Sequence, residues 1–94
     1  MNSISVEDLL KKDNAIIIDI RGNSSYIKSH IPGAISIGEK ELYFHPEKYL
    51  EVMKTYYIYC FSGHKSRFLA HYLNRLGYHT ISVAGGFQHY LLIQ

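Results

Sequence analysis

The chain has 94 residues, of which 47% are hydrophobic and 19% charged, and its formal net charge is +2 with neutral histidines. This composition is typical of one ordinary globular domain, residues 1–94, and excludes a disordered chain. The weak charge excludes the clustered Lys and Arg of a nucleic-acid-binding surface, and no apolar run approaches the roughly 20 residues of a membrane span.

The first half of the chain is predicted to alternate between short helices and strands. Ser5–Asp8 has the pattern of a capping box and predicts a short helix that ends near Lys12. Ala15–Ile20 is a β-branched run typical of a strand buried on both faces, and Asp19 interrupts it near its carboxyl end. The next segments are predicted as a loop, a helical turn, a strand and two helices: Arg21–Ser25, Tyr26–His30, Ala34–Ile37, Glu39–Phe44 and Glu47–Met53.

The second half is predicted to hold two strands, each followed by a helix. The strand Tyr56–Tyr59 ends at Cys60, and after a polar loop the helix Ser66–Leu76 begins. Apolar residues recur along this helix at spacings of three and four and predict one buried face: Phe68, Leu69, Tyr72, Leu73 and Leu76. A strand, a turn and a final helix follow: Tyr78–Val83, Gly85–Gly86 and Phe87–Ile93. This alternation predicts an α/β fold with a mostly parallel central sheet and helices on both faces.

Cys60 is the only cysteine, and it stands where a predicted buried strand ends. Ligands of open α/β sheets bind at that carboxyl edge. Gly63 lets the loop turn its N–H groups toward one point, the next helix presents its positive end there, and Lys65 adds a positive charge. All three features stabilise a thiolate. A lone cysteine is more often buried and inert, but this context favours a nucleophile.

The cysteine count also bears on partners, metals and location. One cysteine excludes an internal disulfide and an internal resolving thiol, so any sulfur that Cys60 carries must pass to an external partner. The six histidines and Cys60 have no zinc-binding spacing, and we predict no metal and no cofactor. The first residues lack the basic and apolar regions of a secretory signal, so we expect a cytoplasmic protein. We expect a monomer with no nucleic-acid and no membrane partner.

Five motifs follow one another along the chain. The first is a hydrophobic strand ending in Asp-x-Arg, Ile16–Arg21, and the second is a His-Ile-Pro-Gly-Ala turn, His30–Ile35. The third is a Cys-x-x-Gly-x-basic-Ser loop, Tyr59–Ser66, and two glycine-containing segments follow, Leu76–Tyr78 and Val83–Phe87. In this order they resemble the single-domain rhodanese-like family, the thiosulfate sulfurtransferases. The resemblance covers nearly the whole chain and implies the rhodanese-like fold.

The resemblance also implies a chemistry. The Cys60 thiolate would take the outer sulfur from thiosulfate or a persulfide donor, hold it as a persulfide, and pass it to a thiol, a sulfur-acceptor protein or another nucleophile. Lys65 would meet the anionic donor. The loop residues assigned to substrate binding are Phe61, Ser62, Gly63, His64, Lys65 and Ser66. Phe61 and Lys65 stand where the family often has arginine, so the donor stays open, and His64 is also interpretable as an exposed loop histidine.

Three further residues are candidates for supporting roles. We expect Asp19 and Arg21 to form an ion pair that supports the loop from behind, because a charge in an apolar strand needs a partner. We expect His30 to hydrogen-bond the backbone rather than act as a base.

Two rival functions remain at the level of sequence. A cysteine phosphatase or arsenate reductase needs Arg at position 66, where this chain has Ser66, and Arg67 on a helix points roughly 100° away. A non-catalytic rhodanese-like interaction module is the second rival, and the presence of Cys60 in an intact loop disfavours it.

Overall fold

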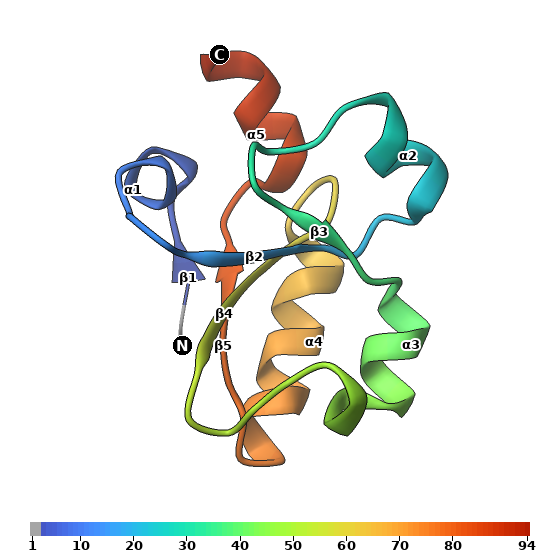
Figure 1. Cartoon of the computed structure of the whole chain (residues 1–94). Helices are drawn as coiled ribbons and strands as arrows, with labels where there is room; N and C mark the ends of the chain where they lie inside the picture. The colour runs from blue at the N-terminus through green and yellow to red at the C-terminus, as the bar shows by residue number, and fades with distance from the viewer. Residues whose placement is uncertain (1–2) are drawn as a thin grey trace.

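The five strands found within residues 3–94, which the computed structural model describes, form one sheet in the order β1-β5-β4-β2-β3 (Figure 1). Each neighbouring pair of strands is parallel, as the sequence predicted. The strands are β1 Ser3–Ile4, β2 Ile16–Asp19, β3 Ile35–Ser36, β4 Thr55–Tyr59 and β5 His79–Val83. The edge strand β1 was not predicted, because two residues carry no periodicity. The central strand β4 is the one that leads into Cys60.

Helices cover both faces of the sheet, which confirms the second part of the fold prediction (Figure 1). One face carries α1 Val6–Leu10, α2 Asn23–Lys28 and α5 Gly86–Ile93, and the other carries α3 Glu39–Phe44 and α4 His64–Arg75. Neighbouring residues of one strand point to opposite faces, so Ile17 packs with Val6 and Leu9 while Ile18 joins a separate cluster around Leu73. Within residues 3–94 no helix combines the length and the apolar character that crossing a bilayer requires.

Two predicted elements in the first half need correction. The segment Arg21–Ser25 is not all loop, because α2 already begins at Asn23. The helix predicted for Glu47–Met53 does not form, and a 3-10 turn, η1 Pro46–Lys48, takes its place. The amide of Glu51 donates to the hydroxyl of Tyr56 at 2.8 Å instead of continuing a helical ladder, and Met53 is 90% exposed. This hydrogen bond to the start of β4 stands in place of a helical one, and the apolar spacing does not produce a helix here.

The longest helix, α4, begins two residues earlier than predicted, and its predicted buried face is confirmed in part. Leu69 and Leu73 are buried and Tyr72 packs half-buried against the same core cluster, whereas Phe68 and Leu76 are 82% and 51% exposed. Ser66 and Ala70 are buried as well, and hydrophobic spacing alone did not identify these small residues.

Candidate active site

Cys60 lies at the carboxyl end of β4, where the carboxyl ends of β2 and β3 also meet. It is only 5% exposed, yet it lines a cleft of about 750 Å³. The walls of this cleft come from the segment after β2, the start of α3, the Cys60 loop and the first turn of α4; they include Arg21, Glu39, Lys40, Ser62, His64 and Lys65. The structure thus brings the predicted loop and Arg21 to one cleft.

Two backbone N–H groups converge on the sulfur of Cys60. Gly63 donates to Sγ at 3.2 Å, and Ser66, in the first turn of α4, donates to the same atom at 3.4 Å. The thiol itself donates to the hydroxyl of Ser66 at 3.6 Å. Gly63 holds a left-handed conformation with φ of 102°, which L side chains rarely adopt, and this turn aims both amides inward. The arrangement stabilises negative charge on the sulfur.

A second buried hydroxyl, on Ser82 of β5, was missed by the sequence prediction. Ser82 is 2% exposed and its Oγ lies 2.8 Å from the Oγ of Ser66. Either hydroxyl can be the donor of this short hydrogen bond, and Ser66 Oγ also lies 3.3 Å from the carbonyl oxygen of Gly63. Ser82 therefore fixes the side chain of Ser66 against the sulfur.

The start of α5 fastens the Cys60 loop. The amide of Phe87 donates to the carbonyl of Cys60 at 2.9 Å, and the amide of Gln88 donates to the carbonyl of Phe61 at 2.8 Å. A β-carbon on Gly86 would overlap the carbonyl oxygen of Cys60 and come within 2.6 Å of that of Phe61. The second glycine of the fifth motif, Gly86, is thus explained by the close approach of α5 to the loop.

Asp19 and Arg21 form the ion pair that the sequence predicted. Arg21 Nη2 lies 2.7 Å from Asp19 Oδ2, and Arg21 Nε lies 3.0 Å from both carboxylate oxygens. Asp19 is fully buried and also accepts a hydrogen bond from the hydroxyl of Tyr59 at 2.8 Å. Since Tyr59 directly precedes Cys60, this network holds the end of β4 from behind.

Both partners of Asp19 stay protonated at neutral pH. Burial is the main cause that raises the pKa of Tyr59 well above its usual value. Burial opposes the charged form of Arg21, but hydrogen bonding to Asp19 and the negative charge of Asp19 together outweigh this effect and raise the pKa of the guanidinium. Arg21 therefore keeps its positive charge beside the cleft, and Tyr59 stays a hydrogen-bond donor.

The other predicted residues of the loop lie at the rim of the cleft. Ser62, His64 and Lys65 are exposed, Phe61 is 51% exposed, and His64 Nδ1 lies 3.2 Å from the hydroxyl of Ser62. Glu39 and Lys40, at the start of α3, also line the cleft and were not predicted. The rule that strand carboxyl ends meet at one edge could have found them, because they follow β3 closely.

His30 makes the backbone contact that was expected, with Nδ1 2.7 Å from the carbonyl oxygen of Tyr26. Among residues 3–94, no three His, Cys, Asp or Glu side chains gather closely enough to hold a metal ion.

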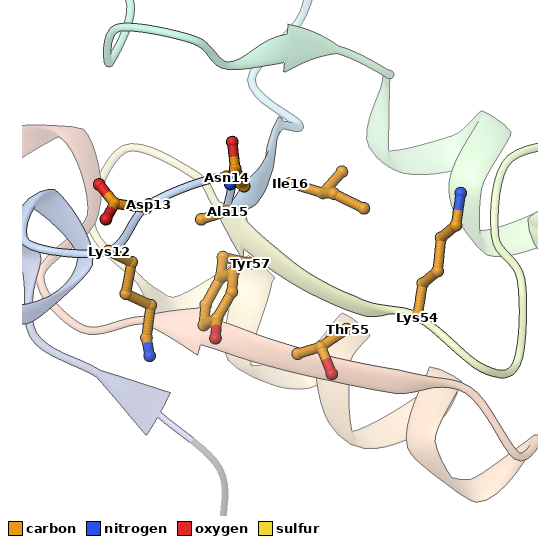
Figure 2. A pocket seen from close by; sticks show the side chains of 8 residues that line it. All are labelled: Lys12, Asp13, Asn14, Ala15, Ile16, Lys54, Thr55 and Tyr57. Atoms are coloured by element: carbon orange, nitrogen blue, oxygen red, sulfur yellow. The ribbon is translucent and has the colours of Figure 1, made fainter.

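A second hollow, of about 580 Å³, lies at the opposite edge of the sheet, where β2 and β4 begin (Figure 2). Two lysines line it: Lys54 is paired with Glu51 at 3.0 Å, and Lys12 Nζ stands 5.8 Å from the ring centre of Tyr57. It contains neither a cysteine nor a buried unpaired polar atom. The chemistry of the chain is therefore concentrated at the cleft of Cys60.

Comparison with known proteins agrees with this fold. A family model described as the rhodanese-like domain matches residues 4–92. A thiosulfate sulfurtransferase GlpE from Coxiella burnetii is 32% identical over 82 residues, which are 86% of this chain and 76% of the relative. A tRNA sulfurtransferase from Pyrobaculum aerophilum is 38% identical over 71 residues, 76% of this chain, and the match spans only 14% of that longer protein.

Among solved structures, a rhodanese-related protein from Thermoplasma volcanium superposes with a TM-score of 0.87 at 30% identity. The match covers 98% of this chain and 92% of that one. The chain belongs to the rhodanese-like family. Its relatives support an activity of the sulfurtransferase type.

Proposed function

We propose that the chain is a sulfurtransferase that carries sulfane sulfur as a persulfide on Cys60. In the first half-reaction the Cys60 thiolate attacks the outer sulfur of thiosulfate or of a persulfide donor. A new S–S bond forms to Cys60 Sγ, the old bond to that sulfur breaks, and sulfite or the donor thiolate leaves with the electron pair. In the second half-reaction an external thiolate takes the outer sulfur and releases the Cys60 thiolate.

The observation that carries the proposal is the convergence of the Gly63 and Ser66 amides on Cys60 Sγ. These donors lie where negative charge rests before sulfur is taken up and again after it is passed on, so they stabilise both the nucleophile and the leaving thiolate. Lys65 and Arg21 line the same cleft and supply positive charge for an anionic donor such as thiosulfate. In this proposal Asp19 and Arg21 support the end of β4.

The local geometry disfavours the phosphatase or arsenate reductase alternative. Ser66 is fully buried and bonded to Ser82, so the position where those enzymes need an arginine cannot grip an oxyanion. Arg67 lines a different hollow, on the outer side of α4. A non-catalytic interaction module would not need two amides directed at a sulfur.

The test is mass spectrometry of the intact protein after incubation with thiosulfate. We expect the protein to become heavier by one sulfur atom, a reductant to reverse the change, and Cys60→Ser to abolish it. A wild-type protein that stays unmodified by thiosulfate and by persulfide donors would refute the proposal. Cys60-dependent hydrolysis of p-nitrophenyl phosphate would instead favour the phosphatase.

A further inference from the structure

The exposed side of α4 begins at the rim of the active-site cleft. Four residues at helical spacing share this side and line a hollow of about 440 Å³: His64, Arg67, Phe68 and His71, called here the α4 face. His64 also lines the cleft of Cys60, so the two hollows are adjacent. Phe68 is 82% exposed, so its ring is open to an apolar side chain of a partner.

The charge of the chain is unevenly distributed, and the α4 face lies in its positive half. All eight Asp and Glu residues lie between Glu7 and Glu51, so residues 52–94 contain no acid. The cations in this acid-free segment are Lys54, Lys65, Arg67 and Arg75, and only Lys54 has a carboxylate partner among residues 3–94. The α4 face therefore combines an apolar anchor with uncompensated positive charge.

The depth of Cys60 limits what can collect its sulfur. With 5% exposure at the base of a cleft, the sulfur can be reached by a small thiol or by a thiol on a narrow chain segment. His64 and His71 are seven residues apart, so the α4 face runs roughly 10 Å along the helix from the rim of the cleft. An extended segment of three or four residues spans that distance.

From these observations we propose that the α4 face docks a protein that accepts sulfur through an acidic segment. This rests on the proposed function. An apolar side chain of the segment covers Phe68, its carboxylates meet Arg67, and its cysteine enters the cleft. The partner thiolate attacks the outer sulfur of the Cys60 persulfide, the S–S bond to Cys60 Sγ breaks, and its electron pair stays on Sγ.

A protein is favoured over a nucleic acid as the occupant. The α4 face and the cleft rim next to it carry one arginine and one lysine, Arg67 and Lys65, which are too few to neutralise a run of phosphates, since that needs clustered Lys and Arg. The centre of the α4 face is instead a bare aromatic ring flanked by charge, the composition of a protein-binding hot spot with a polar rim.

The test compares two synthetic acceptor peptides, using full-length protein loaded with sulfur from thiosulfate. One peptide carries a cysteine, a leucine and several glutamates, and the other has lysines in place of the glutamates. We expect the acidic peptide to accept sulfur with about tenfold higher kcat/KM at low salt, a preference that weakens as salt is added. Transfer to 2-mercaptoethanol measures the proposed function independently of docking.

Three variants locate the effect. Phe68→Ala should lower kcat/KM for the acidic peptide about tenfold, the loss expected when one aromatic contact is removed. Arg67→Glu should abolish the preference for the acidic peptide. Arg75→Glu makes the same charge change on the same helix, roughly 12 Å further along, and should leave the preference intact. All three variants should keep normal transfer to 2-mercaptoethanol.

Four outcomes would overturn the docking proposal while small-thiol transfer remains. The first two are that the two peptides are used equally well and that Phe68→Ala has no effect on the acidic peptide. The third is that single-stranded RNA binds more tightly than the acidic peptide and that this binding depends on Phe68. The fourth is that this chain forms a dimer that Phe68→Ala dissociates. Absence of transfer even to 2-mercaptoethanol would instead count against the proposed function itself.

Discussion

Ser82 links the Cys60 loop to β5, which follows the loop only after the whole of α4. Its hydroxyl is hydrogen-bonded to that of Ser66, whose amide donates to the sulfur of Cys60 and whose hydroxyl accepts from the thiol. Because both hydroxyls are buried, removing one leaves the other without its short hydrogen bond. Ser82 is thus a positioning residue that acts on Cys60 through Ser66.

We expect Ser82→Ala to slow alkylation of Cys60 by iodoacetamide about three- to tenfold at neutral pH, since one hydrogen bond contributes roughly 0.5–1.5 kcal/mol. At high pH, where any thiol is ionised, the rates of variant and wild type should converge. Rates that differ equally at both pH values would mean that Ser82 only shapes access to the sulfur.

Thr80 supplies the matched control for this prediction. It is another buried hydroxyl on β5, bonded to the carbonyl of Ala70 at 3.1 Å and to Asn74 Oδ1 at 2.9 Å, away from the loop. Thr80→Val should lower stability without changing the ratio of alkylation rates at the two pH values.

The sequence was informative for some residues of the site and silent for others. Cys60, Gly63 and Lys65 could be placed because strand, loop and helix are continuous there, and the Asp19–Arg21 pair because a charge in an apolar strand requires a partner. Ser82 is 16 residues from Ser66 and looks like one more polar residue of a strand. Its role appears only when β5 and α4 are brought together.

At the scale of elements, the position of the loop depends on α5. The first amides of α5 bind the carbonyls of Cys60 and Phe61, which is possible only because Gly86 has no side chain. The same contact explains the glycine at the first position of α5, Gly86, whose φ is 58°. Gly85 before it also has a positive φ, 78°, and a β-carbon there would come within 2.8 Å of the β-carbon of His89.

We expect Gly86→Ala to lower the free energy of unfolding by roughly 2–4 kcal/mol and to impair persulfide formation, because it combines backbone strain with overlap against the loop. Urea unfolding and the thiosulfate mass shift measure the two effects. Gly33→Ala is the control: its φ of 87° is also strained, but a β-carbon there meets nothing within 4 Å. A Gly86→Ala protein no less stable than Gly33→Ala would show that α5 does not constrain the loop.

Predicted elements were confirmed where both faces are buried and failed where apolar spacing was the only guide. The strands β2 and β4 were found because both of their faces are buried, which leaves a continuous apolar run. The helix predicted for Glu47–Met53 is replaced by a 3-10 turn and the hydrogen bond from Glu51 to Tyr56. In α4 the spacing found the buried Leu69 and Leu73 but also pointed to Phe68 and Leu76, which are exposed.

At the scale of the whole molecule, Arg21 contacts three segments of the chain. It pairs with Asp19 at the end of β2, donates to the carbonyl of Ser29 beyond α2 at 2.6 Å, and places its guanidinium carbon 3.9 Å from the ring centre of Phe87 in α5. The residue that lines the active-site cleft therefore also fastens the layer that carries α2 and α5 to the sheet.

We expect Arg21→Ala to lower the free energy of unfolding by about 3–5 kcal/mol, because it leaves the carboxylate of Asp19 buried without its cation. Arg21→Lys should recover only part of this loss, since an ammonium cannot form the two-pronged contact with the carboxylate or stack on Phe87. Urea unfolding measures both variants, and the exposed Arg75→Ala should change stability by less than about 0.5 kcal/mol. The loss of unfolding free energy caused by Arg21→Ala should be smaller in a protein that already carries Asp19→Asn, because the buried negative charge is then absent. If the loss is unchanged, the stabilisation by Arg21 comes from its contacts with Ser29 and Phe87 instead.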